Sequence, residues 1–409
     1  MGKLVVLMVT AFGDMVGLLM VLPLMPFYAA RMTGTGFTGR ALESIGFGGE
    51  GAVVAVLVSS FAVAQLISAP FWGRVSDKYG RRPALLVGMG ASGLAYIVFA
   101  FAGSLDILLL SRLVQGAGGG TVGVIQAYVA DATKPEERAK GLGWLSAATN
   151  AGVAIGPVLG SLSAQLGAAA PGLFAALFTL VNMVFAYHYL DESHDIHAAK
   201  AAGKVPQRGW AAISRVVSHS GEPASKLIWI YAIGMGAFHG MTAILALFLA
   251  FRFGVTEKTI GYVFMYIGVI SVFTRAVVLG KLVDTLGEAM LSRLGLTLLA
   301  IGLVAMPLAP GLGTMAIAVA LIPLGTAFTF PCVSGMLSRV VSQHERGLYM
   351  GVQQTFGGVA RVVAPIWAGW SFDMLGKGVP FYTGAGMVVG AMLLGIGIEH
   401  AAGLERAKA

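Results

Sequence analysis

Two charged residues stand within long apolar stretches of the sequence, where charge is costly. Asp14 lies near the middle of the apolar run 4–28, and Arg112 lies within a second run, 106–130. A charged side chain at the centre of a lipid bilayer costs ~2.5 to 3.5 kcal/mol on insertion scales, so it usually faces a cavity or a partner and marks a path for protons or ions. We interpret Asp14 as a proton-binding group. A structural salt bridge to an arginine of the second run is the alternative, and both roles can coexist.

Other polar and aromatic residues within apolar runs are candidates for contact with a bound small molecule. Arg361 lies near the middle of the run 347–372, where a guanidinium can bind an anionic group or repel cations. His239 is equally compatible with helix packing, whereas Arg275 lies close enough to the end of its run to snorkel to the surface. Phe328 and Phe330 could line an apolar pocket, although core packing is the commoner use of such residues. The candidate cavity residues are Gln115, Asn150, Phe238, His239, Phe328, Phe330 and Arg361.

The elements that carry these residues are predicted to be membrane helices. Hydrophobic residues make up 57% of the 409-residue chain and charged residues only 11%, with a mean hydropathy of +0.81, whereas soluble domains are nearer a quarter charged. Runs of about 20 apolar residues can cross a hydrocarbon core of roughly 30 Å. The sequence therefore predicts an all-α protein with twelve spans, near 4–28, 52–72, 84–102, 106–130, 139–167, 172–190, 227–251, 260–283, 290–309, 314–338, 347–372 and 379–398.

A polar segment divides these spans into two sets of six. We expect a first bundle at 1–190, a cytoplasmic linker at 191–226 with a surface helix near 195–219, and a second bundle at 227–409. Residues 29–51 are expected to form a long outer loop. Such a chain is predicted to be a multi-pass monomer of the cell membrane, inner or plasma, surrounded by lipid.

A short basic segment between the second and third spans predicts the orientation. The segment 73–82 holds four Lys or Arg side chains, and short cytoplasmic loops are enriched in these residues. Most of the 27 basic residues fall on the same side, so the net charge of +8 is interpreted as membrane topology rather than nucleic-acid binding. Both termini are therefore predicted to be cytoplasmic.

The basic segment recurs in the second half of the chain, at 280–287. The match has a constant offset of 207 residues, and duplicated halves are typical of secondary transporters. The matched pairs are Gly73 with Gly280, Asp77 with Asp284, and Gly80 with Gly287.

The first copy of this phrase resembles the loop signature of the major facilitator superfamily. Its glycine, aspartate, glycine and paired arginines have the spacing of that signature. The resemblance implies a lock that closes the cytoplasmic gate in the outward-facing state; a topology anchor is the alternative, although an anchor would not need the spaced glycines or the repeat. The gating residues implied are Gly73, Asp77, Gly80, Arg81, Arg82, Asp131 and Asp284, with Asp131 meeting Arg81 or Arg82.

Three further stretches resemble the drug/proton antiporter branch of the superfamily. The spacing of Asp14, Pro23 and Pro26 is similar to the first helix of tetracycline/proton antiporters. The stretch from Arg112 to Gly120 resembles the second motif of the superfamily, whose arginine is associated with proton transfer, and Asp14 is the one deep carboxylate available to it. Residues 143–161 resemble the antiporter motif except at position 161, where serine replaces its final glycine. The residues of that motif are Gly143, Gly152, Gly156, Pro157 and Gly160.

The antiporter-like stretch also has a direct physical interpretation. Gly152, Gly156 and Gly160 lie four residues apart, so they form a smooth groove on one helix face. Pro157 removes a backbone donor, and the helix is expected to bend there. A bent helix with a smooth face can rock against a partner, although plain helix packing also uses such glycines.

The resemblance implies a proton-coupled transporter that exports amphipathic small molecules by alternating access. The proton gradient would supply the energy, with no cofactor. Export of a sugar or another metabolite is an alternative of the same class. A transporter-like receptor or scaffold is an alternative of another class, although it would not need Asp14 or Arg112 in the membrane. The second half departs from tetracycline antiporters, because residues 260–283 contain no histidine and residues 289–310 no acid.

Other classes of chemistry find little support in the sequence. No catalytic triad or phosphate-binding loop is recognisable, so we do not expect an enzyme. The single cysteine, Cys332, excludes an intrachain disulfide and a cysteine metal cluster. Three histidines near the linker, His188, His194 and His197, are not expected to bind a metal.

Overall fold

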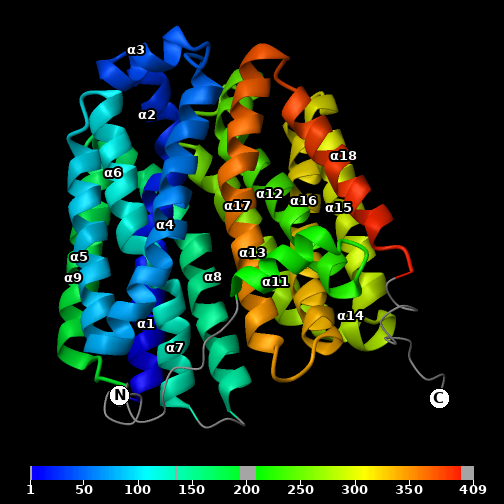
Figure 1. The fold of residues 1–409 in the computed structure, drawn as a ribbon. Coiled ribbons are helices and arrows are strands. Elements are labelled where there is room, and N and C mark those ends of the chain that lie inside the picture. The colour runs from blue at the N-terminus through cyan, green and yellow to red at the C-terminus, as the bar shows by residue number, and fades with distance from the viewer. Residues whose placement is uncertain (1, 134–136, 194–208, 398–409) are drawn as a thin grey trace. The chain divides into compact units, whose positions relative to one another are not determined.

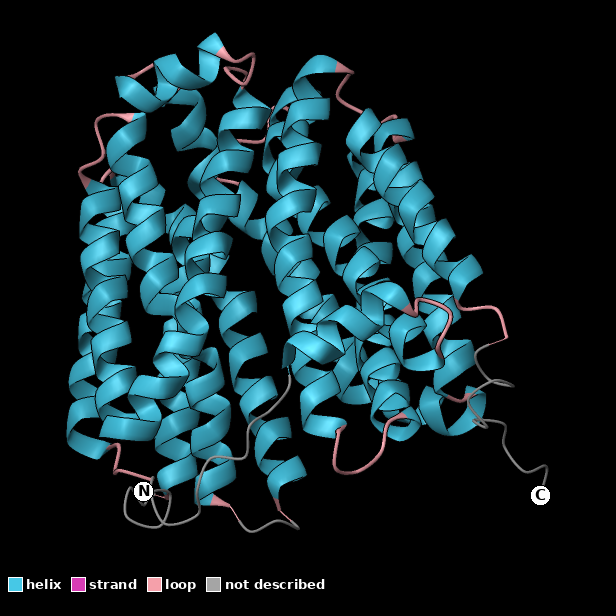
Figure 2. Ribbon diagram, viewed as in Figure 1, coloured by secondary structure: helices cyan, strands magenta, loops and turns pink. Residues whose placement is uncertain are grey.

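The described residues form helices joined by short turns, with no strand among them (Figure 2). The structure is a computed structural model and describes residues 2–133, 137–193 and 209–397. The elements of the first half are α1 (Lys3–Val21), η1 (Leu22–Leu24), α2 (Met25–Met32), α3 (Gly36–Ser44), α4 (Glu50–Tyr79), α5 (Arg81–Ala100), α6 (Leu105–Gly118), η2 (Gly119–Thr121), α7 (Val122–Ala132), α8 (Arg138–Ser163), η3 (Ala164–Leu166) and α9 (Ala170–Tyr189). Those of the second half are α11 (Gly209–Ser218), α12 (Pro223–Phe253), α13 (Ile260–Phe273), η4 (Thr274–Val278), α14 (Leu279–Leu286), α15 (Glu288–Leu308), α16 (Leu312–Val340), α17 (Arg346–Met374) and α18 (Val379–Leu394).

Ten helical segments in the described part of the chain are long and apolar enough to cross a bilayer. The more polar α17, with 29 residues, and the apolar α18, with 16, are the eleventh and twelfth spans (Figure 1). The predicted all-α fold with twelve membrane helices is therefore confirmed. It follows from the repeated apolar runs, because a helix satisfies its own backbone hydrogen bonds in lipid.

Three of the spans are interrupted by short turns that the apolar pattern does not reveal. A 3₁₀ turn at Pro23 separates α1 from α2, and a second 3₁₀ turn separates α6 from α7 within the run of glycines. A π-helical turn, η4, lies between α13 and α14. Turns of this kind change the direction in which side chains leave the helix, and π turns are frequent at functional sites.

The outer segment 29–51 is more regular than expected. α2 continues to Met32, and α3 follows at Gly36. The Asp106 carboxylate of α6 accepts hydrogen bonds from the Phe37 and Thr38 backbone N–H groups at 2.8 and 2.7 Å. Because these donors have no partner within their own helix, a carboxylate at this position fixes where α3 begins.

The described contacts divide the chain into two compact units. Unit 1 comprises residues 1–204 and 246–268, and unit 2 comprises residues 205–245 and 269–409. In unit 1, α1 packs against α8 and α9, and α5 packs against α6 and α9; in unit 2, α15 packs against α16 and α18. The linear boundaries predicted for the two bundles, 1–190 and 227–409, stay predictions.

The polar segment between the sixth and seventh spans contains a short amphipathic helix, α11. Ala212 and Val216 of α11 are buried, whereas Trp210 is exposed. The Arg215 guanidinium donates hydrogen bonds to the Glu222 carboxylate at 3.0 to 3.3 Å, which holds the pKa of Glu222 below its usual value. The rest of the helix expected near 195–219 lies outside the described residues, as do His194 and His197.

Candidate functional site

Asp14 lies on α1 where two other helices of unit 1 approach closely. A Cβ atom at Gly13 would lie 2.5 Å from the Asn182 side chain of α9, and one at Gly17 would lie 2.9 Å from the Thr179 hydroxyl. Asn182 donates a hydrogen bond to the Thr10 backbone carbonyl at 2.9 Å. The half-buried Asp14 carboxylate itself forms no hydrogen bond or ion pair with any described residue.

Arg112 is almost fully buried in α6, with 1% of its surface exposed. Its guanidinium carbon lies 5.6 Å from the centre of the Phe99 ring, and Nε donates to the Ser111 hydroxyl at 3.4 Å. Both terminal nitrogens are buried without a hydrogen-bond partner among the described residues. The salt bridge to Asp14 considered from the sequence is therefore not formed in this structure.

Tyr96 of α5 interacts electrostatically with both charged residues. Its hydroxyl is within electrostatic range of Asp14 and of Arg112, and its ring lies against Gly17 of α1. The buried Gln115 amide lies near the same hydroxyl, although neither of its polar atoms completes a hydrogen bond of good geometry. Unit 1 therefore holds a polar cluster of Asp14, Tyr96, Arg112 and Gln115 inside its helices.

The glycine face of α8 packs directly on α1, the helix that carries Asp14. A Cβ atom at Gly152 would lie 2.8 Å from the Met15 Cβ atom, and one at Gly156 would lie 2.8 Å from the Leu19 Cβ atom. A Cβ atom at Gly160 would collide with the Met20 carbonyl group. The backbones thus approach as closely as only glycine permits. Gly143 differs, because a Cβ atom there would meet nothing within 4 Å.

The opposite face of α8 packs on α13. A Cβ atom at Gly261 would collide with the Pro157 carbonyl oxygen, and one at Gly268 would lie 2.8 Å from the Ala154 Cα atom. The Ser161 hydroxyl accepts a hydrogen bond from the Gly261 N–H group at 2.8 Å and donates one to the Glu257 carbonyl at 2.8 Å. Ser161, the residue at which this chain departs from the antiporter motif, therefore links α8 to the beginning of α13 through two hydrogen bonds.

The segment 73–82 is organised around Arg81, the first residue of α5. Its guanidinium donates to the Asp77 carboxylate at 2.6 Å, the Ser76 hydroxyl at 2.7 Å and the Asp131 carboxylate at 3.0 Å. Asp131 thus meets Arg81, one of the two partners considered from the sequence. Gly80 between α4 and α5 has φ +105°, a conformation that side chains other than glycine rarely adopt.

Glu192, just after α9, caps the beginning of α5. Its carboxylate accepts hydrogen bonds from the backbone N–H groups of Arg81 and Arg82 at 2.9 and 3.1 Å, where an anion is favoured by the helix dipole. The Arg82 side chain donates to the Tyr187 carbonyl and lies over the Tyr187 ring. A Cβ atom at Gly73 would meet nothing within 4 Å, so close approach requires glycine at Gly80 but not at Gly73.

The second copy of the phrase has the same backbone and a different ion pair. Gly287 has φ +80° and separates α14 from α15, as Gly80 separates α4 from α5. Asp284, the counterpart of Asp77, is exposed. The ion pair at the end of this turn joins Glu288, the first residue of α15, to Arg339 of α16. The polarity of this pair is the reverse of that between Arg81 and Asp131.

A second polar cluster lies within unit 2, around Tyr231 of α12. Gln354 of α17 donates a hydrogen bond to the Tyr231 hydroxyl at 3.4 Å, and Arg275 and Arg361 are both within electrostatic range of this tyrosine. The Arg275 side chain, which comes from the π turn η4, has a buried Nε atom and lies within electrostatic range of Tyr231, so it does not snorkel outward as expected. His239, on the same helix as Tyr231, lies within electrostatic range of Arg361.

The aromatic candidates separate into two environments. Phe328 is buried against Leu291 and Cys332, so it packs in the core. Phe330 lies with its ring centre 5.4 Å from that of Tyr231, beside the polar cluster. The rings of Phe238 and His239 are 5.2 Å apart. In unit 1, the Asn150 amide donates to the Ser146 carbonyl of its own helix at 2.6 Å, which uses part of its capacity locally.

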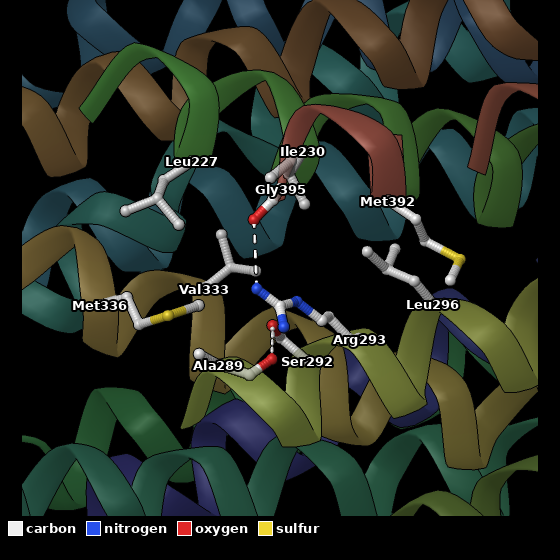
Figure 3. Close-up of a pocket in the computed structure, with 10 residues that line it drawn as sticks. All are labelled: Leu227, Ile230, Ala289, Ser292, Arg293, Leu296, Val333, Met336, Met392 and Gly395. Atoms are coloured by element: carbon white, nitrogen blue, oxygen red, sulfur yellow. Dashed lines mark hydrogen bonds between the residues drawn. The ribbon is translucent and has the colours of Figure 1, made fainter. Parts of the chain in front are cut away.

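Two hollows in unit 2 do not contain these polar clusters. One, of about 20 Å³, lies among α12, α15, α16 and the end of α18, and the Arg293 guanidinium beside it donates to the Gly395 carbonyl at 3.5 Å (Figure 3). Its volume suits a water molecule rather than a drug-sized ligand. The other is an apolar groove of about 870 Å³ among α11, α12, α17 and α18, with Trp229 and Trp367 in its wall.

Several residues of these sites were missed by sequence reasoning. Tyr96 and Tyr231 stand within apolar runs where a tyrosine gives no distinct signal. Glu192 is separated by 111 residues from the Arg81 backbone group that it caps. A signal did exist for Glu288, because it matches Arg81 at the same offset of 207 residues that relates the glycines.

Comparisons with known proteins show which family this sequence matches. A family model described as Major Facilitator Superfamily matches residues 5–365 and 276–403. Multidrug resistance protein 2 of Bacillus subtilis (strain 168) is 27% identical over 392 residues, which cover 94% of this chain and 92% of that protein. Tetracycline resistance protein, class B, of Escherichia coli is 26% identical over 347 residues, which cover 80% and 83% of the two chains.

Solved structures show the same fold. The crystal structure of the human organic anion transporter MFSD10 (TETRAN) aligns with a TM-score of 0.70 and 23% identity, covering 96% of this chain and 98% of that one. A bacterial homolog of the human lysosomal transporter Spinster aligns with a TM-score of 0.71 and 13% identity, covering 98% and 95%. The protein is a multi-pass membrane transporter by fold. It belongs to the major facilitator superfamily, and its relatives include multidrug and tetracycline resistance proteins.

Proposed function

We propose that this protein exports amphipathic small molecules in exchange for protons, by alternating access across the cell membrane, with both termini in the cytoplasm. The single observation that carries the proposal is the Asp14 carboxylate, which lies within a membrane helix and is engaged by no ion pair among the described residues. An ionised carboxylate is costly there, whereas a protonated one costs much less. The names of the multidrug and tetracycline resistance relatives support the substrate class.

Proton binding at Asp14 has a route to the rest of unit 1. Tyr96 lies within range of both Asp14 and Arg112, so a change in the charge of the carboxylate is felt by the hydroxyl that also faces the guanidinium. The same helix, α1, meets the glycine face of α8. A backbone contact without intervening side chains lets α8 slide or tilt on α1 with little repacking, which alternating access requires.

The experiment compares wild type with Asp14→Asn in proteoliposomes under an imposed pH gradient. A drug-susceptibility panel in an efflux-deficient host first identifies a transported compound. Asparagine keeps the shape of the side chain but cannot ionise, so we expect Asp14→Asn to abolish uphill accumulation while retaining substrate binding or downhill exchange. Asp373→Asn is the matched control, because that carboxylate lies at the end of α17, 3.8 Å from the Lys377 ammonium group. Undiminished accumulation by Asp14→Asn would leave Asp14 with a structural role only.

A further inference from the structure

Two arginines in unit 2 converge on one tyrosine. Arg275 comes from the π turn η4 and Arg361 from α17, and both lie within electrostatic range of Tyr231 on α12. Gln354 donates a hydrogen bond to the Tyr231 hydroxyl at 3.4 Å, and the Phe330 ring centre lies 5.4 Å from that of Tyr231. Residues from four segments of the chain, η4, α12, α16 and α17, thus lie around Tyr231.

The helix geometry explains why they meet. Gln354, Gly357 and Arg361 follow one another at spacings of three and four residues, so they share one face of α17. A Cβ atom at Gly357 would lie 2.8 Å from the Tyr231 Cε1 atom, and the missing side chain therefore lets the ring lie on the backbone of α17. Side chains of a helix lean toward its N-terminus, which directs the Arg361 guanidinium back toward Tyr231.

The carboxylates of unit 2 are placed elsewhere. In the described part of this unit they lie at or beside helix ends, at Glu222, Asp284, Glu288, Glu345 and Asp373. Arg361 forms no ion pair with any described carboxylate. A guanidinium held within a membrane bundle without an anionic partner is costly, and a bound anion would compensate it.

We propose that Arg275, Arg361 and Tyr231 form an anion-binding site within unit 2, which holds the acidic group of an amphipathic molecule while Phe330 contacts its apolar part. This inference rests on the proposed function and names the substrate class: amphipathic carboxylates, sulfonates or phosphates. A guanidinium presents paired donors that match two oxygens of such a group, and the tyrosine hydroxyl supplies a further donor. Two fixed positive charges also disfavour lipophilic cations.

The test uses two fluorescent probes that differ by one charged group. The anion 1-anilinonaphthalene-8-sulfonate and the neutral N-phenyl-1-naphthylamine share the same rings, and only the first carries a sulfonate. Binding of each to the purified full-length protein is measured in phosphatidylcholine nanodiscs, after subtraction of empty discs. We expect wild type to bind the anion about tenfold more tightly than the neutral probe, the scale of one charge-assisted hydrogen bond.

Single-residue variants show which side chains cause the preference for the anionic probe. We expect Arg361→Gln and Arg275→Gln each to weaken binding of the anion by about tenfold and to leave the neutral probe almost unaffected. Arg361→Lys retains the charge but not the paired donors, so it should recover part of the affinity for the anion, which shows that the site is folded. Arg293→Gln is the matched control, because this arginine of unit 2 donates to the Gly395 carbonyl and lies outside the cluster. It should change neither probe.

Equal binding of both probes by wild type, or equal losses of both in Arg361→Gln, would overturn the anion site. Proton-driven flux of the probes separates this failure from failure of the proposed function. Flux of the neutral probe without any anion preference would keep export and refute the anion site. Arginine-dependent binding without any flux would keep the site and refute export. In discs that contain phosphatidylglycerol, loss of the wild-type preference would assign the site to a lipid headgroup rather than to a soluble substrate.

Discussion

Arg81 concentrates the interactions of the segment 73–82 in one side chain. It bonds Asp77 and Ser76 of its own turn and Asp131 of α7, while its backbone N–H group donates to Glu192. The side chain is 10% exposed, so these bonds are poorly screened by water. Removal of one acceptor leaves the guanidinium paired with the others, and the segment should remain folded.

The first residue-scale prediction concerns Asp77. We expect Asp77→Asn to slow transport while substrate affinity stays nearly intact, because the family resemblance implies that the lost charge belongs to the gate lock and because Arg81 keeps Asp131. Initial rates of proton-driven flux over a range of substrate concentrations would show a lower kcat at a similar KM. Normal transport by this variant would reduce the segment 73–82 to a topology anchor.

Single residues also mark the limits of sequence interpretation. The family resemblance implied that Asp131 meets Arg81 or Arg82, and the structure shows that Arg81 is the partner. Phe328 and Phe330 were both candidates for the cavity, with core packing as the commoner alternative, yet residues two apart on a helix face different ways, and only Phe330 lies at Tyr231. The helical spacing alone could have separated them. Glu192 could not be found, because a backbone cap made across 111 residues has no local pattern.

At the scale of elements, α8 has close backbone neighbours on two sides within unit 1. Its glycines at positions 152, 156 and 160 meet the backbone of α1, and Ala154, Pro157 and Ser161 meet α13 on the other side. Small residues on both faces bring three backbones together. The sequence indicated the first of these contacts as a smooth groove but could not name the partner helix.

The element-scale prediction uses this difference between crowded and open glycines. A Cβ atom at Gly156 would lie 2.8 Å from the Leu19 Cβ atom and 2.9 Å from the Val16 carbonyl oxygen, whereas one at Gly123 of α7 would meet nothing within 4 Å. We expect Gly156→Ala to reduce the free energy of unfolding by about 1–3 kcal/mol through overpacking and to slow flux. Thermal unfolding in detergent measures the first effect.

Gly123→Ala serves as the control for helix propensity. Alanine is the better helix former by about 1 kcal/mol, so this variant should be as stable as wild type or more so. If Gly156→Ala were equally stable and equally active, the close approach of α8 to α1 would not matter for either property.

The helical elements were predictable to the extent that apolar runs define them. Ten of the twelve spans follow from length and hydropathy, which decide whether a segment can cross lipid, and the more polar α17 and the shorter α18 complete the set. The breaks within spans were not predictable, since the 3₁₀ turn after Gly118 and the π turn at Thr274 depend on packing against neighbouring helices. Arg275, which was expected near the surface, lies in this π turn and within electrostatic range of Tyr231.

At the scale of the whole molecule, the duplicated halves share a backbone device and differ in charge. Gly80 and Gly287 adopt the same left-handed conformation between consecutive spans. The residue that follows each glycine then pairs with the fourth span of its own half: Arg81 with Asp131, and Glu288 with Arg339. The sequence repeat predicted the glycine turn that the two halves share. The structure adds that the ion pair after this turn has opposite polarity in the two halves.

The whole-molecule prediction tests whether this pair is a transferable unit. Glu288→Arg places a second cation beside Arg339 and should reduce the free energy of unfolding by about 1–2 kcal/mol, a modest effect because Arg339 is half exposed. The double variant Glu288→Arg with Arg339→Glu recreates the first-half polarity, with Asp284 placed as Asp77 is. It should recover at least half of the loss in thermal unfolding. A double variant no more stable than the single one would contradict the pairing.

The reversed polarity of the two ion pairs also affects which helices associate with each other while the duplicated chain is being synthesised. Helices inserted early and late have similar lengths, similar apolar surfaces and the same glycine turn, so hydrophobic contact alone offers little discrimination between a first-half partner and a second-half one. If α5 approached α16 instead of α7, Arg81 would face Arg339; if α15 approached α7, Glu288 would face Asp131. Each wrong association would bring like charges together at the membrane edge, and we expect such mispaired intermediates to dissociate before the remaining helices pack.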